Sequence, residues 1–162
     1  TRNVQPETRN PKRVTRNSQP ATRIPQPESR NPNPATRMKS YKELEVYNLA
    51  YEYALEVHKM TMKLPRYELY EQGSQIRRSS KSIKDNIAEG FGRRRYKDEF
   101  IRFLIFAHSS CDETISQLNM ISDIHFPNKP LLDIITKYDK LGRKLNKFIQ
   151  YVETNWQTTR TK

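Results

Sequence analysis

The sequence predicts an all-α protein: an antiparallel up-down four-helix bundle that follows a disordered N-terminal tail. Three observations carry this prediction. Apolar residues recur at three- and four-residue steps in four successive stretches, no stretch alternates at period two as a strand would, and the connections are short. The expected division is a tail at residues 1–40, a bundle at 41–157 and a disordered C-terminus at 158–162.

The net charge points to a polyanionic partner. The 162-residue chain has a formal charge of +12 and a sequence pI of about 9.9, which makes nucleic acid or an anionic surface the first partner to consider. Residues 1–40 hold nine Lys and Arg against two Glu, a net of +7, so 21 minus 16, or +5, is left for residues 41–162. A polyanion-binding role for the bundle must therefore be argued from its local clusters of charge.

The cysteine content and the hydropathy indicate the compartment. Cys111 is the single cysteine, so an internal disulfide cannot form, which fits a reducing cytoplasm. No apolar run approaches the ~18 residues of a membrane span, and the first residues lack the apolar centre of a signal peptide. We therefore expect a soluble cytoplasmic protein without a membrane partner.

The tail is a repeat of period seven, with units such as TRNSQPA and TRIPQPE. Each full unit contains proline and none has an apolar pair at coiled-coil spacing, so neither a heptad seam nor a helix can form. This composition predicts disorder with extended polyproline character. One interpretation of the tail is a basic arm for nucleic acid. The other is a translated DNA repeat that precedes a natural start at Met38.

The first two helices follow directly after the tail. The apolar spacing predicts a first helix over residues 42–63 that ends before Pro65. After the connection LPRYELYEQG, a second helix is predicted over residues 70–89. Gly90 is expected to form a left-handed cap, with Gly92 in the turn that follows.

The third and fourth patterns are longer. The third helix is the most apolar, with one face running from Phe100 to Ile121, and four further apolar residues widen that face: Ile101, Ile105, Phe106 and Ile115. A face this wide is expected to touch more than one neighbour. After the turn FPNKP, the fourth helix runs from Leu131 to Trp156 at the same spacing.

The most basic stretch is QIRRSSKSIKDNIAEGFGRRRYK at residues 75–97. On a helix, its small and apolar residues form one stripe that faces the core: Ile76, Ser80, Ile83, Ile87 and Phe91. A cationic ridge of Arg77, Lys81 and Lys84 lies beside that stripe, and three arginines follow in the turn. A solvated charged face is the structural alternative to a binding surface.

These cations are the candidate nucleic-acid-binding residues. We predict that eight of them contact phosphates, with Phe91 and Tyr96 as aromatic neighbours for unpaired bases: Arg77, Arg78, Lys81, Lys84, Arg93, Arg94, Arg95 and Lys97. No group in the stretch reads base edges in an identifiable way. The expected binding is therefore salt-sensitive and weakly sequence-specific.

No motif for catalysis, metal binding or a cofactor stands out. The three histidines lack the spacing of a metal site, and Cys111, three residues after His108, is expected to be a core residue rather than a zinc ligand or a nucleophile. Asp85 and Glu89 are the carboxylates that a metal-dependent nuclease would use. We expect structural roles for them, since Lys81 precedes Asp85 by four residues and can pair with it.

Three blocks of the sequence resemble a known family. YKELEVYNLA, QIRRSSKSIKDNIAEGFGRRR and EFIRFLIFAHSSCDETISQL are similar to the bacterial 23S rRNA intervening-sequence proteins, also called the four-helix bundle protein family, over residues 38–156. These proteins resemble the accessory variability protein of diversity-generating retroelements, which partners a reverse transcriptase and binds nucleic acid. The resemblance implies a four-helix bundle that assembles as a homopentamer and has no catalytic activity.

Two features depart from the family pattern. The repeat tail is not part of it, and Lys84-Asp85 stands where a Pro-Ser pair is common, which strengthens the basic ridge in this chain.

The sequence leaves three hypotheses for function. The first is a non-enzymatic, oligomeric protein that binds rRNA, other RNA or DNA, with a reverse transcriptase as a candidate partner. The second is a protein–protein interaction scaffold without direct nucleic-acid binding. The third is an enzyme, the nuclease that would use Asp85 and Glu89.

Overall fold

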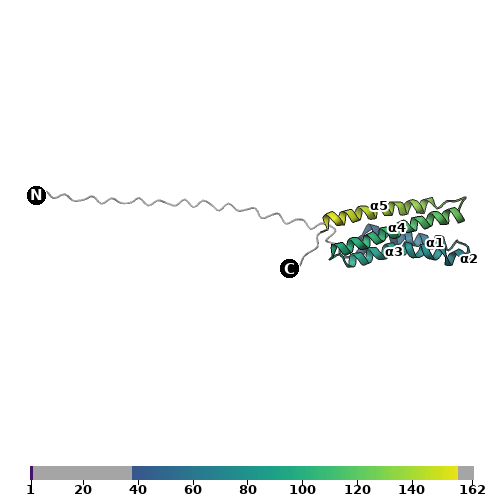
Figure 1. Ribbon diagram of the computed structural model, residues 1–162, viewed down its shortest axis with the longest axis horizontal. Coiled ribbons are helices and arrows are strands. Elements are labelled where there is room, and N and C mark those ends of the chain that lie inside the picture. The colour runs from purple at the N-terminus through teal and green to yellow at the C-terminus, as the bar shows by residue number, and fades with distance from the viewer. Residues whose placement is uncertain (2–37, 157–162) are drawn as a thin grey trace. The chain divides into compact units, whose positions relative to one another are not determined.

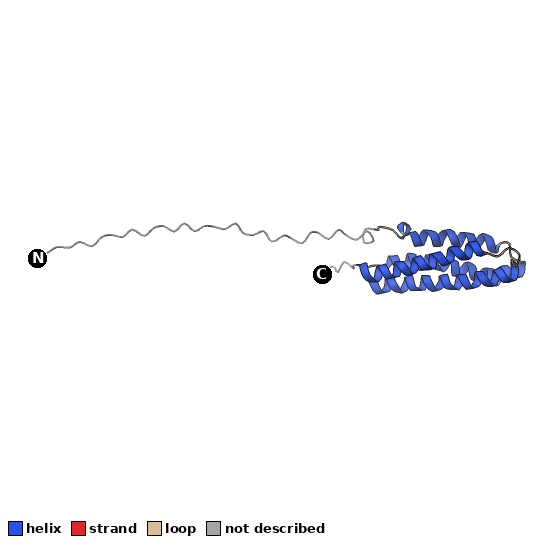
Figure 2. Ribbon diagram, turned by 90° about the horizontal axis from the view of Figure 1, so that it is seen from above, coloured by secondary structure: helices blue, strands red, loops and turns tan. Residues whose placement is uncertain are grey.

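The computed structural model describes residues 38–156 together with Thr1, a part that includes the predicted bundle except for its last residue. Its four long helices are α1 (Glu45–Thr61), α3 (Gln72–Gly92), α4 (Lys97–His125) and α5 (Leu132–Asn155). A 3-10 turn, η2 (Tyr41–Glu43), precedes α1, and a short helix, α2 (Arg66–Tyr70), follows it. Figure 1 shows the long helices side by side, and the regular structure of the described residues is entirely helical (Figure 2).

Not every prediction can be compared with these residues. The predicted disorder of residues 2–37 and 158–162 lies outside the described part of the chain. The division of the chain into a tail, a bundle and a C-terminus therefore stays a prediction.

The long helices pack in chain order around the bundle. α3 packs against α1 and α4, α4 packs against α5, and α5 returns to α1, which closes the bundle. Because the connections are short, successive long helices run in opposite directions. One end of the bundle therefore holds η2, the α3–α4 turn and the end of α5, and the other end holds α2 and the α4–α5 loop.

The core consists of the predicted stripes. All five residues of the α3 stripe are buried, and the largest fully buried side chains elsewhere include Phe100, Leu104, Tyr138, Leu141 and Leu145. Burial of each such side chain contributes about 1.5–3 kcal/mol relative to exposure. On α4, however, Ile105 and Phe106 are exposed. Part of the widened apolar face of α4 is therefore not covered by the other described helices.

Small residues bring α3 and α4 close together. The Ser79 hydroxyl donates to Gln117 at 3.0 Å and accepts from Thr114 at 3.0 Å, and the hydroxyls of Ser82 and Ser110 are 3.1 Å apart. These hydroxyl contacts join α3 directly to α4.

The predicted cap at Gly90 is wrong. α3 continues to Gly92, and no glycine among the described residues has a positive φ. Gly90 is buried, and a Cβ atom at this position would lie 2.7 Å from the Cβ atom of Phe103. The glycine is therefore required by the close approach of α4 and not by a left-handed turn.

The connection between α1 and α3 holds a helix that the sequence did not indicate. Arg77 fixes α2 by donating to the Leu69 carbonyl at 2.8 Å and to the Thr61 hydroxyl at 3.0 Å. The Glu68 carboxylate also lies 3.3 Å from the His125 imidazole at the end of α4, and both side chains are almost fully buried. α2 is therefore held against α1, α3 and α4.

Candidate nucleic-acid interface

The turn between α3 and α4 is anchored by the end of α5. The indole of Trp156 donates to the Arg94 carbonyl at 3.1 Å, and the Lys97 ammonium donates to the Glu153 carbonyl. Trp156 is itself buried against Phe100. The three arginines of the turn therefore lie on a backbone of fixed geometry.

Two of these arginines are engaged within the fold. The Arg93 guanidinium lies 2.9 Å from Glu89 and 3.7 Å from Glu99, and it covers the Phe103 ring at 4.8 Å from the centroid. The Arg94 guanidinium lies 4.1 Å from the centroid of the Phe91 ring. Both arginines carry charge at the surface, but their hydrogen-bonding groups are partly occupied.

Arg95 and Tyr96 are the free members of the turn. Arg95 is exposed and has no ion pair or hydrogen bond from its side chain to any described residue, and the neighbouring Tyr96 ring is 66% exposed. The prediction that Phe91 also faces a ligand is wrong, because Phe91 is 3% exposed and its ring lies under Arg94. Tyr96 alone of these two aromatic residues can stack on an unpaired base.

The cations of α3 likewise include engaged and free side chains. Arg78 and Lys81 are exposed and have no side-chain partner among residues 38–156. The predicted pair of Lys81 with Asp85 is not formed, because the ammonium of the adjacent Lys84 takes that carboxylate instead. Arg77 points toward α2 and serves the fold. The free positive charge of this part of α3 therefore comes mainly from Arg78 and Lys81.

A small pocket on α1 adjoins the ridge. It has a volume of about 260 Å³ and lies between Tyr51 and Leu55 of α1 and the two lysines of α3, Lys81 and Lys84. The Tyr51 ring is 48% exposed. Such an arrangement can hold a base against an aromatic ring while cations meet its phosphate. This pocket was not predicted from the sequence, although Tyr51 and Leu55 lie four residues apart on α1 and both are exposed.

The surroundings of Asp85, Glu89 and Cys111 indicate roles in the fold. Asp85 pairs with Lys84 and Glu89 pairs with Arg93, and within the described range no three His, Cys, Asp or Glu side chains gather as metal ligands. Burial raises the pKa of the Cys111 thiol to about 12. The prediction that Cys111 is a core residue is confirmed by this burial.

The comparison with protein families identifies the chain. The family model described as the 23S rRNA-intervening sequence protein matches residues 42–147, well over half of the sequence. The chain belongs to this family. The resemblance inferred from three sequence blocks is thereby confirmed, and all eight candidate cations lie within the matched region.

The 23S rRNA-intervening sequence protein family is not a known class of enzyme. A search of curated proteins found no match to this chain. None of the described helices of this family member is long and apolar enough to cross a membrane.

Proposed function

We propose that this protein binds nucleic acid without catalysis, through phosphate contacts along α3 and the α3–α4 turn. The observation that carries the proposal is a set of exposed cations without partners among the described residues: Arg78, Lys81 and Arg95. Exposed cations held on a rigid backbone are the groups that position a protein on a phosphate chain. The other predicted cations add to the local potential while serving the fold: Arg77, Lys84, Arg93, Arg94 and Lys97.

The aromatic neighbours favour a single-stranded segment. Tyr96 follows Arg95, and Tyr51 faces Lys81 across the α1–α3 pocket. Stacking of a base on an aromatic ring is worth about 1–3 kcal/mol and tolerates any base. We expect RNA to be the natural ligand, since the family is described by its relation to 23S rRNA.

Assembly would strengthen a modest site. We propose a homopentamer, as the resemblance to this family implies, because five copies of the free cations would bind one polyanion together. A cytoplasmic location suits a protein whose single cysteine is a buried thiol. A reverse transcriptase is the protein partner that we propose for the assembled ring.

A titration at two salt concentrations tests the proposal. Fluorescence anisotropy of a labelled single-stranded RNA, of duplex DNA and of a 23S rRNA fragment should show binding that weakens steeply with salt. The triple variant Arg78→Gln/Lys81→Gln/Arg95→Gln should bind at least tenfold more weakly. For single-stranded RNA its slope of log K against log salt should fall by roughly 2, since each phosphate contact contributes about 0.7.

A matched variant separates this site from the overall charge. Lys140→Gln/Arg143→Gln/Lys147→Gln removes from α5 the same number of exposed cations that have no partner within residues 38–156. It should retain most of the affinity. Equal losses in the two variants, or no binding of any of the three nucleic acids at low salt, would remove the proposal.

The alternative function is an interaction scaffold. The apolar side chains exposed on α4 favour it, since unpartnered apolar surface is typical of protein contacts. If the α3 variant keeps its RNA affinity but loses a co-purifying protein, the scaffold is the better description.

A further inference from the structure

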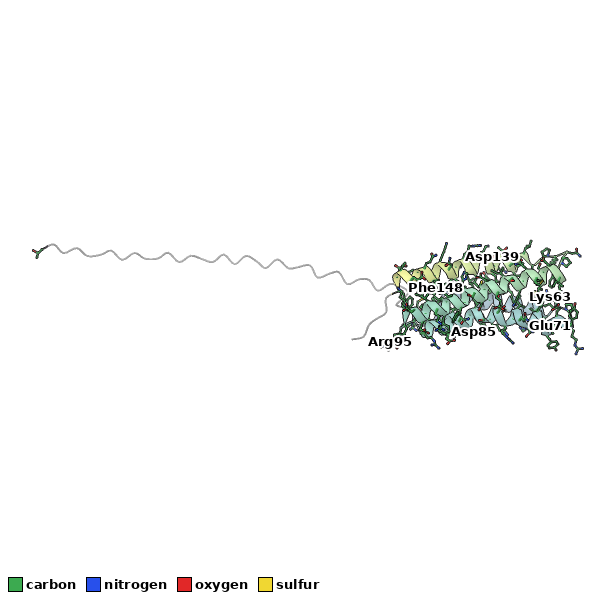
Figure 3. The ribbon with its side chains drawn as sticks, viewed as in Figure 1. Lys63, Glu71, Asp85, Arg95, Asp139 and Phe148 are labelled. Carbon is green, nitrogen blue, oxygen red and sulfur yellow. The ribbon has the colours of Figure 1, made fainter. Side chains whose placement is uncertain are left out.

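A pocket of about 570 Å³ lies at the end of the bundle opposite the arginine turn. The last turns of α1, the α4–α5 loop and the first turn of α5 line it, and Figure 3 labels Lys63 at this end and Arg95 at the other. Its volume falls within the roughly 300–1,000 Å³ of pockets for small organic ligands. Neither the nucleic-acid proposal nor the family match assigns it a role.

The floor of the pocket is apolar and held in place. It is formed by Met60, Phe126, Pro130, Leu131 and Ile134. Met60 and Ile134 belong to the buried core, and Phe126 and Leu131 pack against it. The amide of Leu131 also donates to the Ser122 hydroxyl at 3.0 Å, which fixes the loop. The floor is therefore formed before any ligand arrives.

The rim carries an excess of unpaired positive charge. Its two carboxylates, Glu56 and Asp133, are both taken by Lys137, at 2.9 Å and 3.2 Å. Lys137 itself does not line the pocket. Three lysines do line it, are exposed and have no partner among the described residues: Lys59, Lys63 and Lys129. With three free lysines, two acids and Lys137, the rim has a net charge of +2. An anion is therefore attracted to the edge of an apolar cavity.

We propose that this pocket binds a small amphiphilic anion, with an apolar acyl or alkyl body on the floor and a carboxylate or phosphate at the three lysines. Burial of the apolar body would supply roughly 25 cal/mol per Å², and the lysines would select the charged end.

The chemistry of the lining argues against a sugar or a base as the occupant. The side chains that line the pocket are either apolar or charged, and none of them is a hydroxyl or an amide. Sites that read sugars or bases place neutral donors and acceptors at defined positions. Length of the apolar body and charge are therefore the properties that this pocket can distinguish.

The methyl group of Met60 gives a direct readout on the full chain. With methyl-labelled methionine, decanoate and decyl phosphate should each shift the Met60 resonance in a saturable manner. The resonance of Met120, which is exposed on α4, should stay unchanged. Decanol, which lacks the anion, and inorganic phosphate, which lacks the apolar body, should each bind at least tenfold more weakly. A stronger response to one of the two amphiphiles would identify the preferred head group.

Charge variants complete the test. Lys59→Gln/Lys63→Gln/Lys129→Gln should weaken decanoate binding at least tenfold, whereas the α5 variant Lys140→Gln/Arg143→Gln/Lys147→Gln should not. The proposal is overturned if decanol binds as well as decanoate, if the Met60 resonance does not move, or if both variants lose affinity equally. None of these outcomes depends on whether the protein binds nucleic acid.

Discussion

Arg77 and Arg78 are neighbours of equal charge with different surroundings. The Arg77 guanidinium donates to the Leu69 carbonyl and the Thr61 hydroxyl, whereas Arg78 faces solvent. Loss of hydrogen bonds to a charged donor leaves buried acceptors unpaired, and each such bond contributes about 1.5–3 kcal/mol. Since both bonds are only partly buried, we expect Arg77→Ala to lower the free energy of unfolding by less than their full sum, about 2–4 kcal/mol. Arg78→Ala should lower it by less than about 0.5 kcal/mol.

Urea unfolding of the two variants measures this difference in stability. RNA binding should rank the two variants in the opposite order. Arg78→Ala should weaken RNA binding, while Arg77→Ala should retain it at temperatures where the variant is folded. If Arg78→Ala destabilises the protein as much as Arg77→Ala does, the assignment of these roles is wrong.

The sequence could predict which residues are cationic but not which cations are free. Charge is a property of each residue type, so all eight candidates were visible in residues 75–97. Two of the cations have partners on other elements: Arg77 meets a carbonyl on α2, and Lys97 meets one on α5. These contacts depend on tertiary packing. Helical periodicity describes neighbours along one helix, so it cannot indicate contacts between elements.

Among the elements, α3 and α4 have the most extensive contact, and Gly90 permits their close approach. A Cβ atom at position 90 would also lie 3.2 Å from the Phe100 ring, whereas one at Gly92 would meet nothing within 4 Å. We expect Gly90→Ala to lower the free energy of unfolding by about 1–3 kcal/mol, because helices forced apart lose packing along their length.

Gly92→Ala is the matched control for this prediction. It should leave the stability unchanged or raise it by up to ~1 kcal/mol, since alanine favours the helical state. Thermal or urea unfolding of both variants distinguishes them. A stable Gly90→Ala variant would mean that α4 can move away from α3 without cost.

The existence of the long helices could be predicted, but their ends and the short helix could not. Apolar spacing over fifteen or more residues fixes a buried face, as the α3 stripe shows. α2 has only five residues, too few for a period to emerge, and it is held by Glu68 and Arg77 contacts with distant residues. The end of α3 was misjudged because a glycine can serve close packing as well as a left-handed turn.

At the scale of the whole molecule, the bundle closes on itself yet leaves apolar side chains exposed. On α4 these side chains share an arc of roughly 100° at helical spacing: Ile105, Phe106, Met120 and Ile124. A bundle that needed this arc for its own core would have covered it. The arc is therefore the surface that we expect to join subunits in the proposed homopentamer.

Light scattering coupled to size-exclusion chromatography tests this assembly. The expected mass is five times the chain mass of 19.3 kDa. Ile105→Glu/Met120→Glu should give monomers, because carboxylates would be buried between subunits without partners. Since Ile105 is 47% and Met120 is 55% exposed in the single chain, helicity of the variant should be unchanged. A wild-type protein that elutes at one chain mass, or a double variant that stays pentameric, would contradict the assignment of this surface.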